Sequence, residues 1–398
     1  MGKEGQSRLH LFGLIIVILI AGNLRSPITA VSPVLSEIMD VLNLTNVQGS
    51  LLTSIPLLVF AGCSMLVSKI GARTNILYNL MLSVVLMLIG LYLRVLGNVT
   101  MLYVGSLLIG LGICIGNVMT PAYIKKVFPN RIGLMTGVFS VTMNVFAALA
   151  AGFSIAIGEW TQLGWQGSLG IWLVWSIPAL LVVGIEMFSA RNRRVQEKTA
   201  ETEKARFNVF RSRQAWNISV FMGIQSLVYF CVIAMLPTVL VDYGMEESKT
   251  GLVLSVFQLI MAPIVFICPV VAAKMKDQKL LVSLTGAFML IGLVMLLIFK
   301  AEFIYLSVIL VGISTGLAFS LSILFFSLRS RTTSGTIKVS GHAQSVGYLI
   351  AAFGPPIFGM LHDWDSSWNI SFYFLMLMAV IMTFFGIGAA KRRFVEDY

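Results

Sequence analysis

An arginine interrupts the first apolar segment of the chain. The run LFGLIIVILI (11–20) leads into AGNLRSPITAVSPVL (21–35), which contains Arg25. A guanidinium is a planar fork of N–H donors, which suits a small oxyanion or a carboxylate. Facing lipid, the same group would cost about 2.5–3.5 kcal/mol even on the lenient insertion scale. Arg25 is therefore a candidate electrostatic contact for an anion in a hydrated cavity.

The neighbours of Arg25 support a cavity on one side of a helix. Polar and small residues recur at spacings typical of one helical face: Gly22, Arg25, Thr29, Ser32 and Ser36. Thr29 is thus a second candidate contact. Two other roles for Arg25 stay open. Its guanidinium could extend to the membrane interface, or it could bind the helix carbonyls that are left without a partner near Pro27.

Uncharged polar residues also lie well inside apolar segments. Each costs free energy in lipid unless it faces a partner or water. Two i, i+4 pairs, Gln225–Tyr229 and Gln344–Tyr348, each share a helix face. We expect these side chains to line the same cavity as Arg25, with interhelical hydrogen bonds as the alternative. The full set is Asn117, Asn144, Gln225, Tyr229, Gln258, Gln344 and Tyr348.

Composition sets the class of protein that could hold these residues. The chain is 58% hydrophobic and 11% charged, whereas soluble domains carry about 25% charged residues. Its apolar runs reach the roughly 20 residues that a helix needs to cross a bilayer. The sequence predicts an all-α integral membrane protein with twelve transmembrane helices. The expected spans are 11–35, 47–68, 75–95, 101–124, 132–157, 167–189, 215–241, 250–272, 280–299, 303–327, 338–361 and 369–390.

Basic residues predict the orientation of these spans. Of the 28 lysines and arginines, 24 lie at the termini or in alternate loops, which by the positive-inside rule are cytoplasmic. The opposite loops hold Arg94, Lys249 and Lys300. Both termini are therefore expected in the cytoplasm, with the protein in the cell membrane. The basic charge follows membrane topology, so no nucleic-acid partner is expected.

The lipid bilayer is the expected partner of the outer tryptophans. Aromatic residues at loop edges commonly anchor a protein at the membrane interface. The sequence predicts this role for Trp160, Trp165, Trp364 and Trp368.

A long charged segment divides the chain. Residues 190–214 have no apolar periodicity, and six predicted spans lie on each side. We expect an N-terminal six-helix half (1–189), a cytoplasmic central loop (190–214) and a C-terminal six-helix half (215–398). Two such halves, with a site near mid-membrane, are typical of secondary transporters.

Three motifs give a family resemblance. The segment SMLVSKIGAR (64–73) is similar to the second-to-third loop signature of the major facilitator superfamily, with Ser64 and Ser68 replacing its glycine and aspartate. The segments NLRSPITAVSPVL (23–35) and IGNVMTPAYIKKVF (115–128) resemble the cyanate permease and nitroimidazole transporter family. The resemblance implies a secondary carrier. It does not fix the solute. With Arg25 as its electrostatic contact, the solute would be small and anionic or polar, cyanate-like or another small anion; the alternative is export of uncharged organic compounds such as nitroimidazoles or drugs, with Arg25 structural.

Other classes of function fit the sequence less well. There is no G-x-x-x-x-G-K-[ST] run for ATP, and the histidines (His10, His342, His362) lack metal or triad spacing. We therefore expect no enzymatic activity, no metal and no cofactor. A membrane sensor or scaffold would be favoured by an added soluble domain, but the longest polar segment has about 25 residues. We expect a monomer that binds a small-molecule substrate, with or without a co-transported proton.

Overall fold

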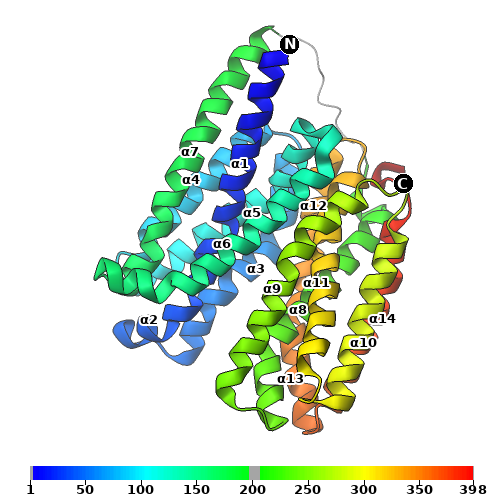
Figure 1. The fold of residues 1–398 in the computed structure, drawn as a ribbon. Coiled ribbons are helices and arrows are strands. Elements are labelled where there is room, and N and C mark those ends of the chain that lie inside the picture. Colours follow the sequence, from blue (N-terminus) through cyan, green and yellow to red (C-terminus); the bar gives the residue numbers. More distant parts are fainter. Residues whose placement is uncertain (1–2, 197–206, 398) are drawn as a thin grey trace. The chain divides into compact units, whose positions relative to one another are not determined.

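The computed structural model describes residues 3–196 and 207–397, and the elements within these ranges are helices (Figure 1). Short 3-10 helices lie at Ser32–Val34, Pro129–Arg131, Val209–Arg211 and Val395–Asp397. The α-helices are α1 (Lys3–Thr29), α2 (Leu35–Leu42), α3 (Asn46–Gly71), α4 (Ile76–Arg94), α5 (Val99–Val127), α6 (Ile132–Thr161), α7 (Trp165–Gln196), α8 (Arg213–Asp242), α9 (Glu247–Ala272), α10 (Lys279–Phe299), α11 (Ile304–Leu328), α12 (Thr333–Ala352), α13 (Gly354–Trp364) and α14 (Asn369–Ala390).

Twelve segments of the described residues are long and apolar enough to cross a membrane. They confirm the predicted all-α membrane fold with twelve spans. The first and eleventh spans, however, each contain two α-helices. In each case proline explains the break.

The first span is broken after Thr29. Here α1 ends, a 3-10 turn at Ser32–Val34 contains Pro33, and α2 begins at Leu35. Proline has no N–H to donate and restricts the residue before it, so the helix stops short of Pro33. The predicted polar stripe is therefore corrected. Arg25 and Thr29 share α1, but Ser32 and Ser36 do not continue its face.

The eleventh span is broken at Phe353, between α12 and α13. Pro355 and Pro356 follow. Prolines are favoured in the first turn of a helix, because the N–H groups there have no partner within the helix and a missing N–H costs no hydrogen bond. The new helix begins at Gly354. A Cβ on Gly354 would lie 2.7 Å from Leu227 Cγ of α8, so a glycine here permits close packing of α13 on α8.

The chain divides into two compact units. The first comprises Met1–Ala205 with Thr332–Gly341, and the second comprises Arg206–Arg331 with His342–Tyr398. The predicted central loop (190–214) falls partly on residues 197–206, which lie outside the described residues. On its described sides, α7 continues to Gln196 and α8 begins at Arg213.

In the first unit, α1 packs against α5, α6 and α7, and α4 packs along α5 (Figure 1). The α4–α5 contact depends on glycine. A Cβ on Gly105 would lie 2.5 Å from the Gly90 carbonyl oxygen, and one on Gly112 would lie 2.7 Å from the Ser83 carbonyl oxygen. Small residues let the helix backbones meet, and this brings the last residue of α4 into the interior of the unit.

In the second unit, α11 packs against α8, α9 and α10, and α14 packs against α8 and α10. Helices α8 and α12 meet at Gly223, where an added Cβ would lie 3.0 Å from the Gly347 Cα. This crossing positions the polar residues of both helices.

Candidate functional site

Arg25 lies half-buried on the last two turns of α1. Its neighbour Asn23 is fully buried and accepts a hydrogen bond from Ser176 of α7. Successive residues turn by about 100° around an α-helix, so Arg25 lies about 200° around α1 from Asn23. Thr29, one turn on, donates to the Arg25 carbonyl oxygen at 3.1 Å. Arg25 and Thr29 therefore lie one turn apart on the same side of α1.

Two further candidates lie on helices that contact α1. Asn117 of α5 and Asn144 of α6 are both half-buried. The Asn144 side-chain amide donates to the Ser140 carbonyl oxygen at 2.8 Å. Because α1 packs against both α5 and α6, the first unit brings its four predicted residues onto three contacting helices.

The other five candidates belong to the second unit. Gln225 and Gln344 are buried, and Tyr229 and Tyr348 are half-buried. These four lie on α8 and α12 beside the Gly223–Gly347 crossing. The fifth, Gln258, is exposed on α9 next to Phe257, whose ring packs against that of Tyr229. All five thus lie on α8, α9 and α12.

The hydrogen bonds of Gln225 show how such a residue can be satisfied locally. Its side-chain amide donates to the Ser226 hydroxyl at 2.7 Å, within the same helix. This bond lies within α8, so it is not the interhelical hydrogen bond given as the alternative to a cavity role.

Arg94 is a functional candidate that the sequence analysis missed. It was assigned to an outer loop, but it is the last residue of α4 and only 1% exposed. Its Nη1 donates to the Pro27 carbonyl oxygen of α1 at 2.5 Å. Its Nε and Nη2 have no hydrogen-bond partner among the described residues. The signal available in the sequence was an arginine that directly ends an apolar run.

Two hydrogen-bonded levels relate α1 to α7: a direct bond at one level, and at the other a bridge through α6 to the residue that follows α1. At one level Ser176 bonds Asn23; at the other, Ser154 of α6 donates to the Ala30 carbonyl oxygen at 2.7 Å and bonds Ser168 at 2.5 Å. We call these two levels the α1–α7 ladder.

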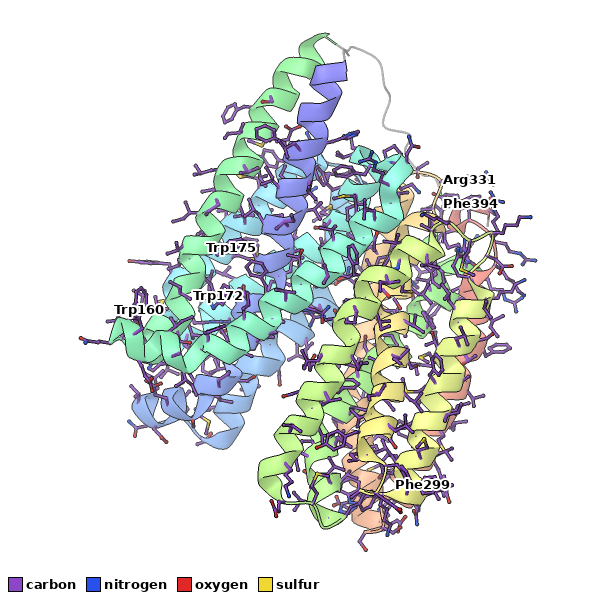
Figure 2. All side chains as sticks on the ribbon, in the orientation of Figure 1. Trp160, Trp172, Trp175, Phe299, Arg331 and Phe394 are labelled. Carbon is purple, nitrogen blue, oxygen red and sulfur yellow. The ribbon has the colours of Figure 1, made fainter. Side chains whose placement is uncertain are left out.

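Two tryptophans of α7 present indole N–H groups to the interior of the same unit. The Nε1 atoms of Trp172 and Trp175 are buried and have no acceptor in the described part of the chain. Figure 2 labels both on neighbouring turns of α7. Their rings pack on Phe146 of α6, and Trp175 Nε1 lies 2.6 Å from where a Cβ on Gly22 would stand. With Arg94, they form a set of buried donors.

His342 is a second residue that the sequence analysis set aside. It is fully buried in α12, and its Nδ1 lies 2.7 Å from the Ser219 hydroxyl of α8. The rings of Phe210 and Trp216 meet it edge-on. The sequence could not predict the burial of His342, because the residues that surround it come from α8 and from the turn before α8.

Arg329 of the second unit is buried as well, but its donors are occupied. Its Nε donates to the Ala389 carbonyl oxygen at 2.9 Å, and its Nη2 donates to the Ala390 carbonyl oxygen at 2.7 Å and to the Gln278 side chain. Burial lowers the pKa of Arg329 to about 10, with Asp277 raising it and Arg392 lowering it further. The group stays charged near neutral pH, and it ties α14 to the start of α10.

The tryptophans predicted at the membrane interface separate into two kinds. Trp160 and Trp364 are 79% and 74% exposed, but Trp165 and Trp368 are 3% and 2% exposed. The interfacial role predicted for the last two is wrong. Trp368 donates through Nε1 to Asp242 at 2.8 Å and stacks on His362 with ring centroids 3.5 Å apart.

The searched, described residues contain no group of three or more His, Cys, Asp or Glu side chains that could hold a metal ion. The candidate residues described above offer cations, amides, hydroxyls and indoles along membrane helices. Such groups bind a polar solute through hydrogen bonds and charge.

Comparisons with known proteins agree with this arrangement. An uncharacterized transporter of Bacillus subtilis (strain 168), YycB, is 35% identical over 380 residues, covering 95% of this chain and 93% of its own. The 2-nitroimidazole transporter of Escherichia coli (strain K12) is 32% identical over 98% of each chain. The cyanate transport protein CynX of the same organism is 24% identical, over 96% of this chain and 98% of its own. These relatives confirm the resemblance drawn from the sequence motifs.

The fold and the family agree. The solved structure of the proton:xylose symporter XylE has a TM-score of 0.77 over 98% of each chain at 14% identity, which shows the shared fold. The family model described as the Major Facilitator Superfamily matches residues 12–350. A match over that range, together with relatives above 30% identity along nearly the whole chain, means that the protein belongs to the Major Facilitator Superfamily and is a multi-pass membrane protein.

Proposed function

We propose that this protein is a secondary active transporter that moves a small anionic or strongly polar solute across the cell membrane by alternating access. The observation that carries the proposal is Arg25, a half-buried cation on a transmembrane helix, with Thr29 one turn further on. A charged side chain inside a span marks a substrate or ion pathway by default. The planar fork of Arg25 suits a small oxyanion or a carboxylate, and one relative is named a cyanate transport protein.

The remaining candidates supply hydrogen bonds to the same solute. Each is an uncharged polar residue on a membrane helix, where it costs free energy unless it meets a partner or water. The proposed wall consists of Thr29, Asn117, Asn144, Gln225, Tyr229, Gln258, Gln344 and Tyr348.

A second candidate function is export of uncharged organic compounds, with Arg25 in a structural role. It is favoured by a relative named a 2-nitroimidazole transporter, which at 32% identity is more similar to this chain than the cyanate transport protein at 24%. In that case the aromatic and amide side chains of the wall, rather than Arg25, would hold the solute.

Transport by the purified protein in proteoliposomes separates the two functions. We expect uptake of at least one small anion from a panel of cyanate, nitrate, formate and acetate, and competition among anions of similar shape. If only 2-nitroimidazole moves and no anion competes, the second function holds. Empty liposomes give the passive background for each solute.

The same vesicles test the proposed proton symport. If a proton travels with the anion, uptake rises as external pH falls at constant anion concentration. A flat pH response, with currents that follow voltage alone, would establish uniport and reject symport.

We also propose the orientation that the basic loops predict, with both termini in the cytoplasm. In a Cys63→Ser background, which removes the native cysteine that is not buried, Ser366→Cys should react with an impermeant thiol reagent on intact cells. Lys276→Cys should react only after the cells are opened. Both positions are exposed, so the reverse pattern would invert the topology. The expected monomeric state stays a prediction.

A further inference from the structure

Arg94 presents a guanidinium that is anchored on one side and unoccupied on the other. Its Nη1 is held by the Pro27 carbonyl oxygen at 2.5 Å. Its Nε and Nη2 are buried without a hydrogen-bond partner among the described residues, and none of the ion pairs seen there involves this arginine. A buried charge with unmade hydrogen bonds is costly unless something compensates it.

The two open nitrogens point to a particular kind of ligand. Nε and Nη2 lie on one edge of the planar guanidinium, and their N–H bonds run parallel. This edge accepts two oxygens of a carboxylate or similar planar anion at once. The anchor at Nη1 holds the plane in place, so the fork is oriented before any ligand arrives.

Trp172 adds a donor at the same level of the bundle. It lies midway along α7 between Ser168 and Ser176, which form the two levels of the α1–α7 ladder. Pro27, whose carbonyl oxygen anchors Arg94, lies between Asn23 and Ala30, the residues that mark these two levels on the other side. Trp172 also shares the helical face of the two serines, because the three residues are four apart. Its Nε1 has no acceptor in the described ranges, and indole can only donate.

Arg329 shows that this chain can satisfy a buried arginine with its own atoms. There the same edge, Nε and Nη2, is occupied by the Ala389 and Ala390 carbonyl oxygens and by Gln278. At Arg94 the described residues supply no such acceptors. The first unit therefore holds buried N–H donors that lack an acceptor. The oxygens of a bound anion could accept hydrogen bonds from them.

We infer that Arg94 and Trp172 form a binding site for a small planar oxyanion, of the carboxylate or nitrate type, inside the first unit. The fork of Arg94 binds two oxygens, and the indole of Trp172 donates to the anion. The site is separate from the contact proposed for Arg25, and it does not depend on which solute is transported.

Anion binding by purified protein tests the site without a transport assay. Thermal unfolding in detergent is followed while formate or nitrate is raised at constant ionic strength, with chloride as the balancing anion. Because a ligand that binds only the folded state stabilises it, we expect the Tm to rise and saturate with formate and nitrate. Chloride, which lacks a two-oxygen edge, should act only at higher concentration. Equal effects of all anions would mean a nonspecific salt effect and would overturn the site.

Two variants assign the binding to these residues. Arg94→Lys keeps a charge that can reach the Pro27 carbonyl but loses the fork, and should weaken formate binding tenfold or more. Trp172→Phe keeps an aromatic ring but loses the N–H, and should weaken it severalfold. If Arg94→Lys does not fold, Trp172→Phe decides, because Phe retains most of the packing. Unchanged affinity in whichever variants fold would overturn the proposal.

Matched controls separate binding from stability. Arg329→Lys removes the other buried fork, so it should lower the Tm but leave the formate-dependent rise intact. Trp160→Phe, at an exposed position, should change neither. Arg25→Gln distinguishes the two arginines: if it abolishes the formate effect while Arg94→Lys retains it, the anion binds at Arg25 and the present inference is wrong.

Discussion

Arg25→Ala should abolish most transport of an anionic solute while the protein still inserts and folds. Removing a charge from a span lowers the cost of insertion. The lost charge-assisted hydrogen bond contributes about 1.5–3 kcal/mol, which corresponds to roughly a 10- to 150-fold loss in affinity. Initial uptake rates in proteoliposomes, over a range of solute concentrations, measure this loss as an increase in KM.

Arg25→Lys distinguishes binding from a merely interfacial arginine. Lysine keeps the charge but not the planar fork, so it should restore only part of the affinity. An arginine that reaches the interface would be replaced equally well by lysine, and alanine would then leave KM unchanged. Lys249→Ala is the matched control, because it removes an exposed charge that pairs with Glu246. Near-normal anion uptake by a well-folded Arg25→Ala protein would reject the proposed site.

Gly105→Ala should destabilise the first unit by about 1–3 kcal/mol, the usual cost of overpacking. The added methyl would stand 2.5 Å from the Gly90 carbonyl oxygen and 2.9 Å from the Arg94 backbone nitrogen. These are backbone atoms, so relief requires α4 and α5 to move apart. The same movement would shift Arg94 away from Pro27. Thermal unfolding in detergent, with size-exclusion profiles before heating, measures the effect.

Gly152→Ala provides a control of opposite sign. A Cβ at Gly152 of α6 would meet no atom within 4 Å. Alanine is favoured over glycine inside a helix by about 1 kcal/mol, so this variant should be neutral or more stable. If Gly105→Ala were as stable as Gly152→Ala, the close approach of α4 and α5 would not be required by the fold.

The sequence alone determined the membrane class, the twelve spans and the family. A helix needs about 20 apolar residues to cross a bilayer. Each span can therefore be recognised from its own residues alone. The motif around Arg25 and the one after the fourth span are equally local, which is why the resemblance was visible before any helix was placed. The prolines at positions 33, 355 and 356 were also visible, but their effect on the first and eleventh spans needed the helix boundaries.

Only the tertiary structure decided which polar residues are enclosed and by what. Arg94 and Lys249 read alike in the sequence, as basic residues in outer loops, yet one is buried and the other exposed. The difference arises because the carbonyl that anchors Arg94 belongs to Pro27, 67 positions earlier. Trp165 and Trp368 were likewise misplaced at the interface. Burial depends on neighbours that belong to helices far away in the sequence, and the local composition around a residue does not predict those neighbours.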